Sequence, residues 1–235
     1  MKSGLIGAIA ALGMLAAANV QAAAVVSPEI TLSFTADNVA NSYWVLDGAN
    51  EIIAGMVLST SSSGAGGRPN PNEDWRQVDE RTESLSPGDY KIVFGVTNNN
   101  DRYPAGFLAE IMGPITGSSL VTNITDWTAS VAEFAAVSAS RSVGDDLSAL
   151  LPAGAPMVVE AANADGGIWP EISEIDGSAQ WIWASSADVA GQSAWIATEI
   201  TVVPIPAAGV LFLSAISGLL LLGRRRSRGE VGLAS

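Results

Sequence analysis

Carboxylates are the main side chains in this sequence that could carry out acid–base chemistry, because the chain has no histidine and no cysteine. That composition excludes Ser-His-Asp and Cys-His nucleophiles, histidine-ligated zinc, thiolate metal sites and disulfides. Acids occur as neighbours at Glu73-Asp74 and Asp79-Glu80, and Glu171 lies close to Glu174. Glycoside hydrolysis needs two carboxylates that face each other across a cleft, whereas neighbours on a strand point to opposite faces. The pattern therefore favours solvated surface acids and a protein that is not an enzyme; an Asp- and Glu-dependent glycan hydrolase is the weaker alternative.

Two stretches rich in oxygen ligands are the candidate calcium sites. They are Asn98-Asn99-Asn100-Asp101 and Asp165-Gly166-Gly167. Calcium takes about six to eight oxygen ligands, and neither stretch has the ligand spacing of an EF-hand loop. Because Asn, Asp and Gly are also the usual residues of turns, ordinary turns are the favoured interpretation. Asn100, Asp101 and Asp165 remain the candidate calcium ligands, and no other cofactor is predicted.

Three tryptophans are candidates for stacking on a sugar ring. Trp75 follows the polar stretch Asn72-Glu73-Asp74, so it is either an exposed binding anchor or the residue that pins a loop to the edge of the domain. Trp181 and Trp183 are two positions apart, so on a regular strand they share one face. Core packing is the favoured interpretation for that pair, because large aromatics supply much of the buried area of a core.

The charge balance limits the partners of the chain. Of the 24 acidic and 11 basic residues, 23 acidic and 6 basic residues lie between positions 25 and 202, which gives that segment a net charge of −17. Such a surface repels nucleic acid and anionic lipid headgroups, and it suits divalent cations or neutral glycans. A solvated acidic surface without a partner is the simpler interpretation, and nucleic-acid binding is not predicted.

Hydrophobic alternation predicts the elements that position these residues. Short apolar runs with a period of two are separated by clusters of Gly, Pro, Asn and Asp. This pattern predicts one all-β domain over 25–202, an antiparallel β-sandwich or jelly roll without internal repeats. The predicted strands span 29–35, 43–46, 51–58, 90–96, 106–112, 157–161, 180–184 and 194–203.

Turn residues and local composition predict the connections between these strands. Asp47-Gly48 favours a tight hairpin, and Ser86-Pro87-Gly88-Asp89 is a turn that leads into the strand over 90–96. Residues 59–72 are almost all Ser, Gly, Pro and Asn, which predicts a long mobile loop. Residues 128–139 are rich in alanine and predict one or two helical turns.

Both ends of the chain carry targeting patterns. Lys2 precedes an apolar run over 5–18, and small residues follow up to Ala24, which predicts a signal peptide over 1–24 that signal peptidase removes. At the other end, residues 207–223 carry no charge and 224–228 contain four arginines. A helix needs roughly 20 apolar residues to cross a bilayer, and prolines fit in its first turn. We therefore expect a transmembrane helix at about 207–223.

The arginines set the expected orientation of this anchor. Under the positive-inside rule they stay in the cytoplasm, together with a short tail over 229–235. The domain over 25–202 is therefore expected outside the cytoplasm. The protein is predicted to be exported and held in the membrane by its C-terminal helix.

Three parts of this end occur in a fixed order, namely Val203-Pro204-Ile205-Pro206-Ala207, the apolar segment, and Arg224-Arg225-Arg226. In that order they resemble the PEP-CTERM class of sorting signals, in the variant that reads Val-Pro-Leu-Pro-Ala, with Ile205 in place of leucine. The resemblance covers 203–228. It implies processing near Pro-Ile-Pro-Ala by an exosortase-like membrane transpeptidase, and release or transfer to the cell surface of a bacterium that makes extracellular polysaccharide.

A second resemblance covers most of 25–202. An Ala-Asp-Asn turn at 36–38, a strand closed by Asp47-Gly48, and later a Trp-Ile-Trp run at 181–183 resemble the galactose-binding-like jelly roll found beside glycosidases and on bacterial surface proteins. Ser-Pro-Gly-Asp at 86–89, with the strand and Asn98 that follow it, and Gly-Phe-Leu-Ala at 106–109 match the same order. The chain departs from that pattern in having Asp47 where asparagine is usual and a long loop before Trp75. The candidate ligand-binding residues are Trp75, Asp37, Asn38, Asn98 and Asp101.

These observations predict a non-enzymatic protein of the cell surface or extracellular matrix. Its expected role is the binding of exopolysaccharide or other glycans in adhesion or biofilm formation. A structural surface component without a ligand is the alternative that the sequence does not separate from it, because a fold does not specify a ligand.

Overall fold

The computed structural model describes residues 27–37, 39–58, 75–98, 105–117, 119–151, 157–165, 169–184 and 191–205. Apart from Ser27 and Ile205, they belong to one compact unit, Pro28–Pro204. The predicted signal peptide, the long loop over 59–72, and the tail from Pro206 onward lie outside the described residues. Within the described ranges, no helix is both long and apolar enough to cross a bilayer.

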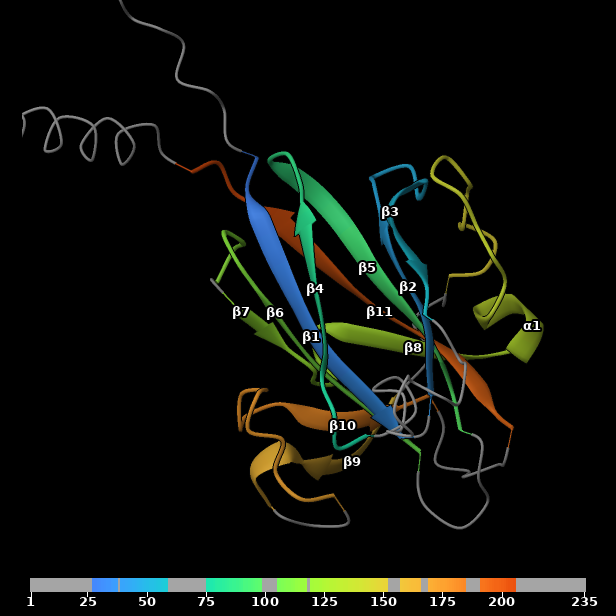
Figure 1. Cartoon of the computed structure of the whole chain (residues 1–235), viewed down its shortest axis with the longest axis vertical. Coiled ribbons are helices and arrows are strands. Elements are labelled where there is room, and N and C mark those ends of the chain that lie inside the picture. The colour runs from blue at the N-terminus through green and yellow to red at the C-terminus, as the bar shows by residue number, and fades with distance from the viewer. Residues whose placement is uncertain are drawn as a thin grey trace, which may run out of the picture. The chain divides into compact units, whose positions relative to one another are not determined.

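Two antiparallel sheets make up the described chain (Figure 1). Sheet A has the order β4-β1-β6-β10-β9, and β7 pairs with β6. Sheet B has the order β3-β2-β5-β11-β8. The strands of sheet A are β1 (Glu29–Asp37), β4 (Asp79–Ser84), β6 (Gly106–Met112), β7 (Ser119–Val121), β9 (Val158–Ala162) and β10 (Gln180–Trp183). The strands of sheet B are β2 (Val39–Leu46), β3 (Ile52–Val57), β5 (Gly88–Thr97), β8 (Trp127–Ala132) and β11 (Ser193–Val202).

The inner faces of the two sheets pack on each other through aromatic rings. Phe34 of β1 and Phe107 of β6 belong to sheet A, and their ring centroids lie 4.9 and 4.8 Å from that of Phe94 on β5 of sheet B. Trp127 of β8 extends the same cluster, 6.0 Å from Phe107. All four side chains are buried. The alternation that predicts the strands therefore also places one apolar face of each sheet in a shared core, and the all-β antiparallel sandwich is confirmed.

Each outer face is covered in part by a connecting segment. On sheet B, Trp44, Val93 and Trp195 are buried under residues 133–151, which include the short helix α1 (Phe134–Val137). Gly95 permits this close approach, since a Cβ there would lie 2.8 Å from the Val137 carbonyl oxygen. On sheet A, Leu108 and Trp181 are buried under residues 169–179. The 3-10 helix η1 (Asn163–Asp165) precedes this cover.

The structure contains all the predicted strands and adds three more, β4, β7 and β8. The prediction of helix over 128–139 is wrong for its first part, because Thr128 to Ala132 pair with β11 as strand β8. One helical turn does follow, as α1. The predicted hairpin between β2 and β3 forms, with a loop longer than a tight two-residue turn. Asn50 has a φ of 64° there, and its N–H donates to the Asp47 carbonyl oxygen.

Candidate functional site

The outer face of sheet B changes from apolar to polar along its strands. On β5, Val93 lies under the covering segment, whereas Lys91 and Asp89 on the same face are half-buried and exposed. On β11, Ala197 is buried, and Glu199 and Thr201 are exposed. The polar part of the face lies toward the end of the sheet where β11 finishes. A strand face that is open and polar only at one end offers hydrogen-bonding groups to a ligand from solvent.

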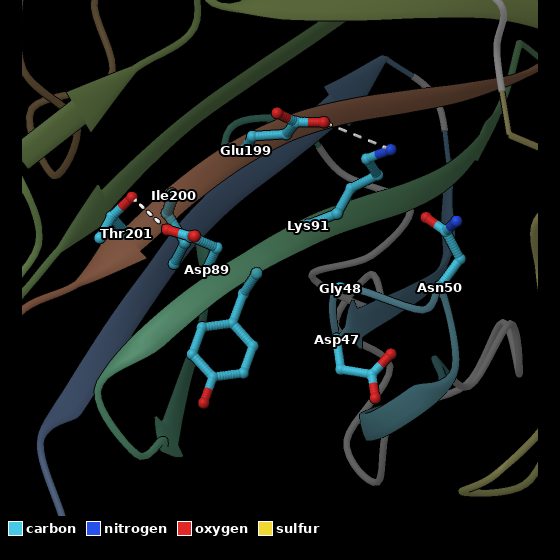
Figure 2. A pocket seen from close by; sticks show the side chains of 9 residues that line it. Asp47, Gly48, Asn50, Asp89, Lys91, Glu199, Ile200 and Thr201 are labelled. Atoms are coloured by element: carbon cyan, nitrogen blue, oxygen red, sulfur yellow. Dashed lines mark hydrogen bonds and ion pairs between the residues drawn. The ribbon is translucent and has the colours of Figure 1, made fainter.

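A hollow of about 380 Å³ lies on this polar part of the face (Figure 2). The hairpin turn forms one wall, and β5 and β11 form the floor. Figure 2 shows Asp47 and Asn50 on the hairpin side, opposite Asp89 and Thr201. The lining consists of Asp47, Gly48 and Asn50 from the turn, Asp89, Tyr90 and Lys91 from β5, and Glu199, Ile200 and Thr201 from β11.

A second hollow of about 300 Å³ adjoins the first on the β8 side. The two share Lys91 and Glu199, so together they form one depression across sheet B, which we call the outer groove. The other lining residues of this second hollow are Thr125, Asp126, Thr128, Leu151, Ala197 and Thr198. Leu151 is the end of the described segment that covers the apolar part of the face.

Lys91 and Glu199 are directly opposite each other on β5 and β11. The Lys91 Nζ lies 3.4 Å from Glu199 Oε1, and the Glu199 side chain is 79% exposed. An ion pair so open to water contributes little to stability, about 0 to 1 kcal/mol. The pair therefore offers a charged donor and a charged acceptor at the junction of the two hollows, and the fold does not depend on it.

The other carboxylates of the outer groove accept hydrogen bonds from the protein itself. Asp89 accepts from the Thr201 hydroxyl at 2.7 Å, and Asp126 accepts from the side-chain amide of Asn123 at 2.9 Å. Asp47 Oδ1 accepts from the backbone N–H groups of Ala49 and Glu51 at 2.9 and 3.0 Å. A carboxylate has about four lone-pair sites, so each keeps acceptor capacity beyond these bonds. The groove thus presents oriented acceptors whose side chains are already held in place.

The described residues contain no cluster of three or more His, Cys, Asp or Glu that could hold a metal ion. The predicted calcium ligands Asn100 and Asp101 lie outside the described residues. Asp165 is the last residue of η1.

Two of the predicted ligand-binding residues, Asp37 and Asn98, lie in the described sandwich but do not line the outer groove. Asp37 ends β1 in sheet A, is buried, and accepts a hydrogen bond of 2.8 Å from the Trp169 indole N–H. Asn98 is buried directly after β5 in sheet B, where its backbone bonds Gln192 and Gly191. The strand ends bring both residues to the same end of the sandwich, but in different sheets. Asn38 and Asp101 lie outside the described residues.

Trp75 lies on the outer face of sheet A and is half-buried. It packs against the cluster that contains Leu108 and Trp181. Its carbonyl oxygen accepts a hydrogen bond of 2.9 Å from the Thr35 hydroxyl, and the Arg76 guanidinium lies 4.2 Å above its ring. These contacts hold the segment after the long predicted loop onto β1.

Trp181 and Trp183 do not share a face, so that prediction is wrong. The pairing of β10 with β9 shifts register between Trp181 and Ile182. Trp181 packs in the outer cluster of sheet A, whereas Trp183 packs with Ile182 in the core between the sheets. Both side chains are fully buried, which confirms the prediction that they are core aromatics. Neither can serve as an open platform for a sugar ring.

The start of the predicted sorting motif is attached to the sandwich. Val203 directly follows β11, and its N–H donates a hydrogen bond of 2.7 Å to the Pro114 carbonyl oxygen. Pro204 and Ile205 are exposed. The other predicted sorting residues, Pro206, Ala207, Arg224, Arg225 and Arg226, lie outside the described residues.

The sequence predicted β5 and β11, which form the floor of the outer groove, but it missed β8 and did not identify the residues of the groove. Asp89, Lys91, Glu199 and Thr201 alternate with apolar residues on β5 and β11. Farther along these strands, the same faces carry the apolar residues Val93 and Ala197. This change from polar to apolar along one face was the signal in the sequence that could have located the groove. The hairpin residue Asp47 could be assigned only to its turn. Comparison of the chain with protein-family models, curated proteins and solved structures gave no match.

Proposed function

We propose that this chain is a non-enzymatic, exported protein of the cell surface or extracellular matrix, and that its sandwich binds exopolysaccharide or other neutral glycans in adhesion or biofilm formation. The observation that carries the proposal is the outer groove, an open depression lined by oriented carboxylates, four threonines and one ammonium group. Sugar hydroxyls both donate and accept hydrogen bonds, so they match this mixed lining.

The charge of the outer groove selects among glycans. Four carboxylates, Asp47, Asp89, Asp126 and Glu199, line it together with Lys91, and Lys91 already pairs with Glu199. The net negative potential opposes uronic-acid or sulfated polymers and leaves neutral polysaccharides as the matching class. The proposal includes no catalytic step.

The sequence patterns at both ends support the location. Signal peptidase would remove 1–24, and the segment over 203–228 would be the substrate of an exosortase-like membrane enzyme. The domain would then stay outside the cytoplasm, first anchored and later at the cell surface or released. The galactose-binding-like jelly roll, as the specific form of the sandwich, is part of the same proposal.

A panel of neutral and anionic polysaccharides tests the binding proposal with the full chain in detergent. We expect neutral polymers to bind and Glu199→Gln to weaken that binding. Glu171→Gln is the matched control, since Glu171 is an exposed carboxylate outside the outer groove. If no polysaccharide in the panel bound above background, the glycan-binding role would be excluded.

A second candidate function, a self-assembling structural component, is favoured by one edge of sheet B. The strand β8 lies at that edge, and its residues Trp127–Ala132 carry no charge. Val131 is 57% exposed, and Phe134 directly beyond the strand is 52% exposed. An uncharged, exposed edge strand is a template for pairing with another chain. Sedimentation of the protein with and without Val131→Lys distinguishes this role, because the lysine should dissociate any assembly that uses this edge.

A further inference from the structure

The end of β11 is flanked on both sides by other backbone segments. On one side, Thr201 and Val202 pair with the first residues of β5. On the other side, β8 pairs with β11 only as far as Thr198, and residues 113–116 take its place beyond that point. The end of this strand is therefore held as an interior strand of a sheet.

Two backbone hydrogen bonds, which together form one antiparallel bridge, hold residues 113–116 against the end of β11. Ile115 and Val202 form an antiparallel bridge, and both side chains are buried. The Thr116 N–H donates to the Thr201 carbonyl oxygen at 3.0 Å, and the Val203 N–H donates to the Pro114 carbonyl oxygen at 2.7 Å. The last of these bonds belongs to the first residue of the sorting motif.

Gly113 fixes the position of the segment over 113–116, which we call the clamp. Its φ is +144°, and a Cβ at this position would lie 2.8 Å from the Glu29 carbonyl oxygen at the start of β1. The clamp over 113–116 thus rests on the first strand of the domain and holds the last one. Figure 1 shows that β1 begins and β11 ends at the same end of the sandwich.

An enzyme that cuts a peptide bond must reach an extended stretch of chain whose backbone groups are accessible. The Val203 N–H is engaged by Pro114, whereas the Ile205 side chain is 47% exposed and lies just beyond the compact unit Pro28–Pro204. Accessible backbone therefore begins at about Pro204.

We propose that processing of the tail occurs at the Pro204–Ile205 bond or at a bond beyond it, so that Val203 and Pro204 stay with the folded sandwich. The inference rests on the proposed function, because it concerns the enzyme that would act on this motif. The C–N bond of the scissile peptide breaks. The carbonyl carbon on the sandwich side takes a hydroxyl from water or the nitrogen of a primary-amine acceptor, and the amine that leaves with the apolar segment takes the proton.

The direct test expresses the full chain in a bacterium that has an exosortase-type transpeptidase and determines the C-terminus of the product by mass spectrometry. A product that ends at Pro204 or later supports the inference. A product that ends at Val203 or earlier overturns it, while leaving the sorting proposal intact. Complete absence of processing overturns the sorting proposal itself and the inference with it.

Limited digestion of the full chain with subtilisin, in detergent, tests the clamp without the sorting enzyme. From the native chain we expect a sandwich fragment that ends at Pro204 or later. In Gly113→Ala we expect a fragment that ends at Val202 or earlier, because cleavage before Val203 should become about tenfold faster. Gly144→Ala is the matched control, because Gly144 also has a positive φ, +94°, and a Cβ there would meet nothing within 4 Å. If Gly113→Ala does not fold, Ile115→Thr is the second variant. Upstream cutting in the native chain would overturn the inference.

Discussion

The Tyr43 hydroxyl donates a hydrogen bond of 2.5 Å to Oε1 of Glu83, and this bond joins sheet B to the edge strand of sheet A. Tyr43 lies on β2 among the core residues, and Glu83 lies on β4. Burial, and then the bond to Glu83, raise the pKa of Tyr43 well above its ordinary value of 10.0. The phenol therefore stays protonated in the folded protein at pH values where it ionises in the unfolded chain.

The raised pKa of Tyr43 predicts a loss of stability in alkali. The stabilisation it contributes is complete below about pH 10, the pKa in the unfolded chain, and declines as the pH rises toward the higher folded pKa. Urea unfolding from about pH 8 to about pH 11 measures this decline. Tyr43→Phe should be less stable by about 1 to 2 kcal/mol at neutral pH and should show a weaker alkaline decline. Equal declines in the two proteins would contradict the assignment.

Gly106→Ala should destabilise the cover of sheet A. A Cβ at Gly106 would lie 2.8 Å from Trp181 Cε3 and 3.1 Å from Trp169 Cζ2, and these two rings stack at a centroid distance of 4.6 Å. Overpacking of this kind costs about 1 to 3 kcal/mol. Denaturant unfolding followed by tryptophan fluorescence measures it. Gly48→Ala serves as the control, because a Cβ at Gly48 meets nothing within 4 Å.

Asp37→Ala should reduce stability because it removes the acceptor for the Trp169 indole N–H. A buried donor left without its acceptor costs about 1 to 3 kcal/mol. Asp37→Asn should cost less, since its amide oxygen can still accept. If Asp37→Ala instead kept its unfolding free energy and lost glycan binding, Asp37 would belong to a ligand site, as the sequence suggested.

Lys91→Met should leave the fold intact and weaken glycan binding. The Lys91–Glu199 pair is exposed, so its loss should change the unfolding free energy by no more than about 1 kcal/mol. A bound sugar, however, would lose a charged donor where the two hollows meet. Titration of the best neutral polysaccharide against both proteins, alongside thermal unfolding, separates the two effects. Undiminished binding in the variant would exclude this part of the outer groove as the site.

Period-two alternation in the sequence was sufficient to predict the strands that contribute one apolar face to the core, such as β1 and β5. It could not reveal β4, because the inward positions of that edge strand are Asp79, Arg81 and Glu83. Their burial is made possible by partners distant in sequence or on the same strand: Arg81 bonds Asp79 at 2.8 Å, and Glu83 accepts from Tyr43. Inward charges are a recognised way to protect a sheet edge, yet they look like a loop in the sequence.

The register irregularity at Trp181 and the outer groove show a second limit of sequence reasoning. Two tryptophans at a spacing of two share a face only if the strand is regular, and the cluster that each ring joins is set by residues distant in sequence. The groove likewise combines Asp47, Asp89 and Glu199, which come together only through the pairing of β5 with its two neighbours. Long-range pairing is not encoded in any local pattern.

The tail leaves the domain from β11, a strand hydrogen-bonded to β5 along its whole length from Ser193 to Val202. Because interstrand bonds run perpendicular to an antiparallel strand, a pulling force on the chain beyond Pro204 loads these bonds in shear, all at once. A force perpendicular to the strand would instead open these bonds one at a time. The sandwich is therefore built to bear mechanical tension at the point where the chain would be tethered.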